Sequence, residues 1–242
     1  MPRVVKENEY AVKRNEILGV AQRLVYTTGF EQMSIQDILD ELKISKGAFY
    51  HYFNSKLDLL DGLMERMMDE AEKVLRPIVE TDGLPAIEKL RQYFNAGSQW
   101  KIARKSFMID LMRVWYTDSN ALVRQKQEAS AIKHIAPMLA KIVRQGIAEG
   151  VFTTTFPDQI GNMIWGLSQG ITEEVAEVLL AEVPPADALP RLEATVGAYS
   201  EAMERILGAP AGSLPLADIA MLKEWLVAPP EKKKTVSKLE IL

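Results

Sequence analysis

The sequence of 242 residues contains no cysteine and only two histidines, His51 and His134. Without cysteine the chain can form neither a disulfide framework nor a thiolate metal site, which fits a protein of the reducing cytoplasm. His134 has no second ligand-type residue at the spacing that metal sites use, so we interpret it as a structural or solvent-facing side chain. The sequence therefore predicts no metal site.

Long apolar runs are also missing from the chain. The longest uncharged stretch, residues 159–172, has about 14 residues, whereas a membrane-spanning helix needs roughly 20. The N-terminal segment MPRVVKENEY lacks the apolar core of a secretory signal. We expect no membrane span and a cytoplasmic location.

Each common catalytic constellation lacks a member in this sequence. There is no Glu-x-x-His pair, no glycine-rich phosphate loop and no serine elbow, and the absence of cysteine excludes a thiol nucleophile. We therefore expect neither an enzyme nor a bound cofactor. An all-helical enzyme with a carboxylate-only site remains an alternative.

The formal net charge is -4, which taken alone argues against a protein that binds nucleic acid. The charge is unevenly distributed, however, because residues 1–60 hold as many basic as acidic residues. Two of the basic residues, Lys46 and Lys56, flank a short predicted helix where they would neutralise phosphates. The placement of the charges thus leaves DNA binding open.

Residues 34–56, SIQDILDELKISKGAFYHYFNSK, predict two short helices joined by a tight turn. Ser34 followed by Asp37 is close to a capping box, and apolar residues then recur at helical spacing. Ser45 is a second N-cap, and the short helix after it carries Phe49 and Phe53 on its apolar side. This arrangement predicts a helix-turn-helix, whose second helix enters the major groove of DNA.

The same segment carries a family resemblance. GAFYHYFNSKLDLL, preceded by SIQDILDELKISK and by a first helix that ends in TTGF, resembles the TetR family of bacterial transcriptional regulators. The match covers roughly the first 70 residues and is specific, since several positions agree at fixed spacing. The resemblance implies an all-helical homodimer that binds a palindromic DNA operator, and a larger C-terminal domain that binds a small effector. Repression with release by the effector is the family's usual mode, while a helix-turn-helix protein adaptor remains an alternative.

The resemblance also implies roles for individual residues. Direct base contact falls to the start of the second helix, at Lys46, Gly47 and Ala48. The small residues at 47 and 48 would let the helix sit deep in the groove. Phosphate contact falls to Tyr50, His51 and Lys56. The starts of the two helices, whose N-termini favour anions, would clamp the DNA backbone through Ser34, Gln36 and Ser45.

From residue 55 onward, proline and glycine punctuate one predicted helix after another, and no strand pattern appears. We predict an all-α fold with helices up to about residue 79 and over residues 85–95, 99–116, 120–149, 157–181, 186–207 and 216–227. The predicted domains are a flexible arm (residues 1–10), a helix-turn-helix domain (11–71), an effector-binding and dimerisation domain (72–228) and a disordered tail (229–242).

Aromatic and methionine side chains crowd one segment of the larger domain, which suits an apolar pocket with adaptable walls. The residues that we predict to contact a mostly apolar effector are Trp100, Arg104, Phe107, Met108, Leu111, Met112, Trp115 and Met163. The alternative for each apolar residue is ordinary core packing, and for Arg104 it is solvent exposure.

Two of the predicted helices carry features of a helix–helix interface. Small residues at Gly166 and Gly170 would let another helix approach closely, and residues at spacings of three and four form a coiled-coil-like seam further along. One recognition helix reads only a few base pairs, so a specific operator generally requires two. We therefore predict a dimer interface that includes Gly166, Gly170, Leu192, Val196, Tyr199 and Met203; packing within one chain is the alternative.

Overall fold

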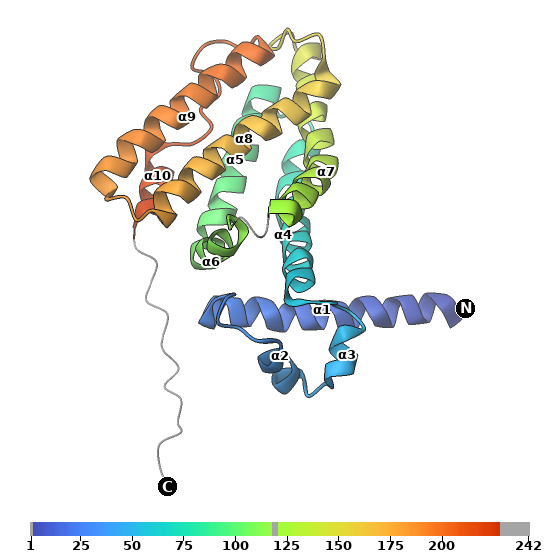
Figure 1. The fold of residues 1–242 in the computed structure, drawn as a ribbon. Helices are drawn as coiled ribbons and strands as arrows, with labels where there is room; N and C mark the ends of the chain where they lie inside the picture. The colour runs from blue at the N-terminus through green and yellow to red at the C-terminus, as the bar shows by residue number, and fades with distance from the viewer. Residues whose placement is uncertain (1, 118–120, 228–242) are drawn as a thin grey trace. The chain divides into compact units, whose positions relative to one another are not determined.

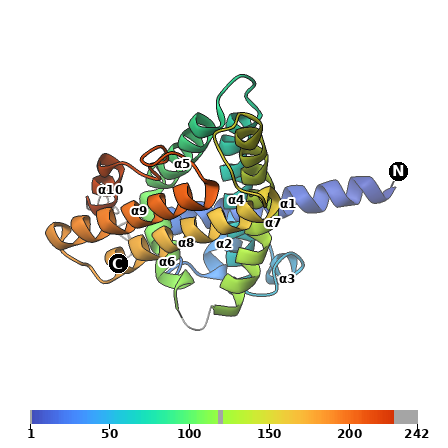
Figure 2. The same cartoon turned by 90° about the horizontal axis from the view of Figure 1, so that it is seen from above.

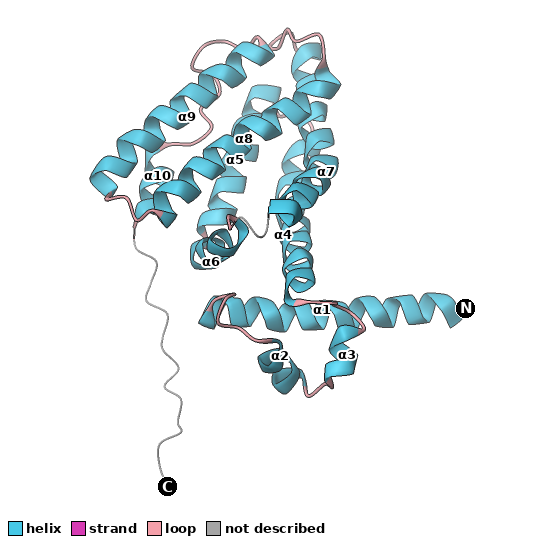
Figure 3. Cartoon of the chain, in the orientation of Figure 1, coloured by secondary structure: helices cyan, strands magenta, loops and turns pink. Residues whose placement is uncertain are grey.

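The computed structural model describes residues 2–117 and 121–227, and every regular element in these ranges is an α-helix (Figures 1 and 3). The prediction of an all-α fold is confirmed. The helices are α1 (Pro2–Thr28), α2 (Ile35–Leu42), α3 (Lys46–Tyr50), α4 (Lys56–Glu80), α5 (Ala86–Ile102), α6 (Lys105–Trp115), α7 (Ala121–Ala148), α8 (Pro157–Leu180), α9 (Pro185–Leu207) and α10 (Ile219–Leu226).

The described residues divide into two compact units on either side of the bond between Leu63 and Met64. We call the first unit the head and the second the body. Helix α1 begins at Pro2, so residues 2–10 are helical where the sequence suggested a flexible arm. Proline is tolerated in the first turn of a helix, and no glycine or further proline interrupts this stretch. The predicted tail at 229–242 lies outside the described residues.

The core of the head is formed by apolar side chains from each of its helices. Ile17 of α1, Ile38 of α2 and Phe49 of α3 are fully buried, and Phe53 and Leu59 join them from the chain that follows. Burial of these side chains holds α2 and α3 in place, because helices of eight and five residues are too short to be stable alone.

In the body, α7 and α8 pack at very close range, and α8 and α9 lie side by side in both views (Figures 1 and 2). A side chain at Gly161 of α8 would place its Cβ 2.3 Å from the backbone oxygen of Ala136 in α7, so only glycine fits there. Gly146 near the end of α7 similarly makes room for the ring of Phe152. Glycine thus sets how closely these helices approach.

Candidate DNA interface and ligand cavity

Local capping interactions fix the start of α2 and the turn between α2 and α3. The Ser34 hydroxyl accepts from the Asp37 backbone N–H at 3.1 Å, and the Asp37 carboxylate accepts from the Ser34 backbone N–H at 2.7 Å. Lys43 ends α2 in the left-handed region with a φ of 52°, and the Ser45 hydroxyl then caps α3 by accepting from the Ala48 N–H. These bonds set where α3 begins and which side of it faces outward.

The outward side of α3 is a polar and aromatic surface. Phe49 is fully buried, whereas its neighbour Tyr50 is 41% exposed and lies with its ring 6.0 Å from the Lys46 ammonium. Lys46 and Gly47 are exposed. A Cβ at Gly47 would meet nothing nearer than 3.9 Å, so the chain itself does not require glycine there.

Two aromatic residues that the sequence reasoning missed complete this surface. Tyr10 of α1 lies edge-on to the exposed His51 ring at 5.6 Å and against the Tyr52 ring at 4.8 Å. The contact brings α1 to the C-terminal end of α3. We name Lys46, Gly47, Tyr50 and His51 the recognition surface, and Tyr10 and Tyr52 support it.

Lys56, predicted to bind phosphate, has contacts within the head. Its ammonium donates to the Glu31 backbone oxygen at 3.0 Å and lies 4.8 Å from the centre of the Phe30 ring. Burial lowers the pKa of this lysine below its usual value. Lys56 therefore ties the chain after α1 to the start of α4, and its contact with phosphate stays a prediction.

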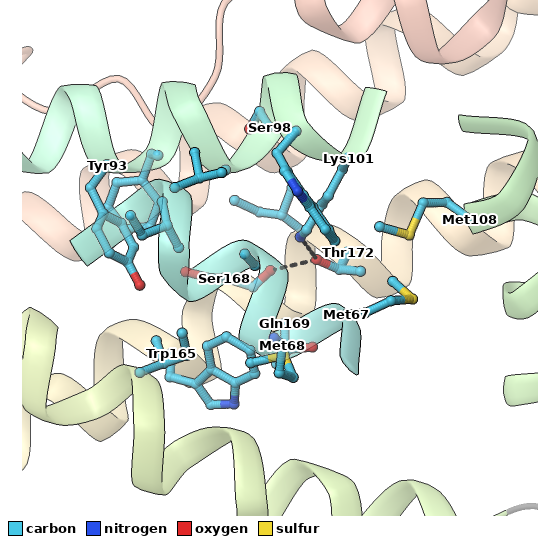
Figure 4. A pocket seen from close by; sticks show the side chains of 18 of the residues that line it. Met67, Met68, Tyr93, Ser98, Lys101, Met108, Trp165, Ser168, Gln169 and Thr172 are labelled. Carbon is cyan, nitrogen blue, oxygen red and sulfur yellow. Dashed lines mark hydrogen bonds between the residues drawn. The ribbon is translucent and has the colours of Figure 1, made fainter. Parts of the chain in front are cut away.

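The body contains a cavity of about 290 Å³ between α4, α5, α6, α7 and α8 (Figure 4). Its wall is predominantly apolar, with methionines from α4, tryptophans from three helices and aliphatic side chains between them. The volume lies near the lower end of the range typical of small-molecule sites, about 300–1,000 Å³. The described part of the body can therefore enclose a small, mostly apolar molecule.

Few polar groups line this cavity. The Lys101 ammonium of α5 donates to the Thr172 hydroxyl of α8 at 3.4 Å, and burial lowers its pKa. Tyr93, also on α5, is only 5% exposed, and its hydroxyl has no hydrogen-bond partner among the described residues. Burial raises the pKa of Tyr116, at another part of the wall, to about 12, so its phenol stays protonated.

Comparison with known proteins places both units in one family. The family model for bacterial regulatory proteins of the TetR family matches residues 17–63, and the model for a tetracyclin repressor-like C-terminal domain matches residues 110–175. The chain belongs to the TetR family. The first match covers the helix-turn-helix of the head and the second covers parts of α6, α7 and α8.

Curated TetR-family relatives are similar over more than half of this chain. The regulator TtgR of Pseudomonas putida is 28% identical over 157 residues, which are 62% of this chain and 74% of TtgR. EthR of Mycolicibacterium smegmatis is 31% identical over 140 residues, which are 51% of this chain and 64% of EthR. These relatives are named transcriptional regulators, and this chain is a DNA-binding transcriptional regulator of the same family.

Solved structures, among them one of a TetR-family regulator, share the fold of this chain. A regulator from Pectobacterium atrosepticum superposes with a TM-score of 0.59 at 19% identity, covering 84% of this chain and 98% of that protein. Escherichia coli NemR gives a TM-score of 0.52 at 18% identity, covering 82% of this chain and 99% of NemR. In the part of the TetR-family chain that the structure describes, no helix is long and apolar enough to cross a membrane, and no three metal-ligating side chains cluster.

Five of the eight predicted effector residues line the cavity of this TetR-family body: Trp100, Met108, Leu111, Met112 and Trp115. The other three do not. Phe107 is fully buried in the core, and Met163 is 52% exposed on the surface of α8. The Arg104 guanidinium lies 4.4 Å from the Trp100 ring and 3.7 Å from the Glu70 carboxylate, which holds it outside the lining. Helical spacing predicted the segment that holds the cavity, but it did not distinguish the residues on the cavity wall from their neighbours.

The sequence reasoning missed the polar residues of the cavity and its α4 wall. The missed residues that matter most are Met64, Met67, Met68, Tyr93, Lys101, Ser168 and Thr172. A usable signal was the spacing of positions 93, 97 and 101, which puts Tyr93, Gly97 and Lys101 on one face of α5. Serine and threonine at positions 168 and 172 repeat the spacing of four on α8.

The predicted dimer seam in α8 and α9 is largely packing within one chain, which corrects the prediction. Leu192, Val196 and Met203 are 1%, 6% and 0% exposed in the single chain, so helices of the same chain already cover them. A Cβ at Gly170 would lie 2.1 Å from the hydroxyl oxygen of Tyr199, so this glycine accommodates the chain's own tyrosine. Of the six predicted residues, only Gly166 is on the exposed side of its helix, with nothing within 4 Å of its Cβ position.

Proposed function

We propose that this TetR-family regulator is a repressor that binds a palindromic operator as a homodimer and is released by a small molecule in the body cavity. The observation that carries the proposal is the recognition surface. Its polar and aromatic groups project from a helix whose opposite side is anchored by Phe49 in the core of the head. One of the relatives, KstR2 of Mycobacterium tuberculosis, is named a repressor and is 28% identical over 144 residues.

The recognition surface suits the major groove for stereochemical reasons. Lys46 at the start of α3 can donate to guanine acceptors, and Tyr50 one turn later can donate to phosphate. Between them Gly47 offers no side chain, although nothing in the protein requires glycine there. The simplest explanation is that the DNA needs the space. Ser34 and Gln36 are exposed at the start of α2, and Ser45 is exposed at the start of α3.

A homodimer supplies the second recognition helix that a palindromic operator needs. We propose that the partner packs against the exposed sides of α8 and α9. Gly166 of α8 and Gly197 of α9 both have open space at their Cβ positions, which supports a close approach of a second chain. Sedimentation at micromolar concentration tests this assembly, and a monomer there would rule it out.

Replacing Lys46 by alanine, or Tyr50 by phenylalanine, should weaken operator binding without unfolding the protein. Both side chains are exposed or half-exposed and form no buried hydrogen bond, so the helices of the head should stay folded. We expect a loss on the order of 1–3 kcal/mol for a residue that reads a base. A gel shift against the promoter region next to the protein's own coding sequence measures it.

The matched control for this measurement is Lys73→Ala, which removes an exposed lysine from α4 in the body. Its affinity for the operator should equal that of the unmodified protein. If Lys46→Ala and Tyr50→Phe also bind normally, α3 is not the DNA-reading element.

A further inference from the structure

Tyr93 in the cavity wall has an unusual environment. Its side chain is 5% exposed, and its hydroxyl finds no hydrogen-bond partner among the described residues. A buried hydroxyl without a partner is destabilising, because the group loses its bonds to water without replacing them. Since the side chain lines the cavity, a molecule bound there can supply the missing partner.

Lys101 lies two helical turns after Tyr93 on the same face of α5. Its ammonium has one long hydrogen bond, to the Thr172 hydroxyl at 3.4 Å, and Figure 4 shows the side chain reaching toward α8. The Thr172 hydroxyl donates its own proton to the Ser168 backbone oxygen, and the Ser168 hydroxyl donates to that of Ile164. These hydroxyls thus give the ammonium a weak neutral acceptor and no negative charge.

Other sheltered lysines in the body are better satisfied. Lys89, which is 5% exposed, donates to the Val79 backbone oxygen at 3.0 Å, and Lys105 donates to the Glu224 backbone oxygen at 2.8 Å. Within the described residues, Lys101 has no such carbonyl and forms no ion pair. The other charged residue of the cavity wall, Glu128, is exposed. An ammonium taken out of water without a counterion is costly, so its retention in an apolar wall needs a reason.

We propose that the cavity binds an apolar molecule that carries a single carboxylate, with the carboxylate paired to the Lys101 ammonium. One ammonium balances one negative charge, and the methionine and tryptophan wall encloses the apolar remainder of the molecule. The size of the cavity suits an acid with on the order of ten carbon atoms. This inference deepens the proposed function, on which it rests, by naming the class of the effector.

The test compares decanoate with decan-1-ol, which have the same chain length and differ in the headgroup charge. Binding to the full-length protein is followed by the fluorescence of Trp100, Trp115 and Trp165, which line the cavity. Decanoate should bind about tenfold or more tightly than decan-1-ol, as expected for a charge-assisted pair in an apolar site. Equal affinities, or no binding of decanoate, would overturn the proposal.

Lys101→Met supplies the second arm, because methionine keeps the volume of the side chain and removes its charge. The variant should lose about tenfold or more in affinity for decanoate and keep its affinity for decan-1-ol. It should also melt no lower than the unmodified protein, since an unpaired ammonium leaves an apolar wall. The surface variant Lys73→Met should bind both compounds normally. Unchanged binding of decanoate by Lys101→Met would refute the pairing of the carboxylate with Lys101. If the variant does not fold, the comparison of decanoate with decan-1-ol in the unmodified protein still tests the proposal.

Release of operator DNA, measured in parallel, separates this inference from the proposed function. Decanoate that binds through Lys101 but leaves the protein on its operator would support the carboxylate site and contradict the role of the cavity in release. A neutral apolar compound that releases the operator, with no binding of decanoate, would support release and contradict the carboxylate site.

Discussion

Replacing Phe49 by alanine is expected to unfold the head and abolish DNA binding. The Phe49 ring is fully buried and lies 5.8 Å from the ring of Phe53. Helix α3 has five residues, so its position depends on this side chain more than on its own hydrogen bonds. Truncation of a buried phenylalanine costs about 3–5 kcal/mol, a large fraction of the stability of a unit this small. Operator binding and the denaturant midpoint of the full-length protein measure the effect.

The matched control is Tyr50→Ala, which removes a ring of the same size from the next position. Tyr50 is 41% exposed, so its loss should change the stability of the head by no more than about 1 kcal/mol. It should still reduce operator affinity, because the ring and hydroxyl belong to the recognition surface. Equal losses of stability in the two variants would mean that α3 is not oriented as described.

Replacing Gly161 by alanine should strongly destabilise the body. The added Cβ would lie 2.3 Å from the Ala136 backbone oxygen, and no side-chain rotation can relieve a clash with backbone. Helices α7 and α8 would have to separate along their contact, at a cost of about 3 kcal/mol. For a protein of this size, that cost corresponds to a decrease in melting temperature on the order of 10 °C. Calorimetry or circular dichroism measures the decrease.

Gly97→Ala in α5 is the control, since it adds the same methyl group to a helical glycine. Its Cβ would meet nothing nearer than the Leu75 Cδ2 at 3.8 Å, an ordinary contact. Alanine is also the better helix former by about 1 kcal/mol, so this variant should melt at or above the temperature of the unmodified protein. A melting temperature for Gly161→Ala no lower than that of Gly97→Ala would contradict the close packing of α7 and α8.

The head was predictable from sequence because its signals are local. Ser34 with Asp37, and Ser45 with Ala48, form the caps that the residue types indicate. The break between α5 and α6 was not predictable in the same way. The sequence suggested an interruption near residues 96–98, yet the helix runs through Gly97, whose Cβ position is in contact with Leu75 of α4. Tertiary packing here overrides the low helix propensity of glycine. Helix α5 ends instead at Ala103, and α6 starts after Arg104.

In the candidate sites, too, features set by local sequence were predictable and features set by tertiary packing were not. Periodicity identified Leu192 and Met203 as residues that face another helix, and both are buried. Periodicity does not say whether that helix belongs to the same chain, and here the chain's own helices bury them. Lys101 was missed for a related reason. A lone lysine in an amphipathic helix usually faces solvent, and its sheltering depends on α8, which is distant in sequence.

The most direct test of the account is selection of DNA bound by the full-length protein from random duplexes. We expect enrichment of an inverted repeat whose half-sites lie about 34 Å apart, or a multiple of that spacing, because two recognition helices related by a two-fold axis require it. The enriched duplex should bind Lys46→Ala more weakly than the unmodified protein. No enrichment over random DNA, or an enriched sequence that Lys46→Ala binds equally well, would contradict the assignment of α3 as the element that reads the operator.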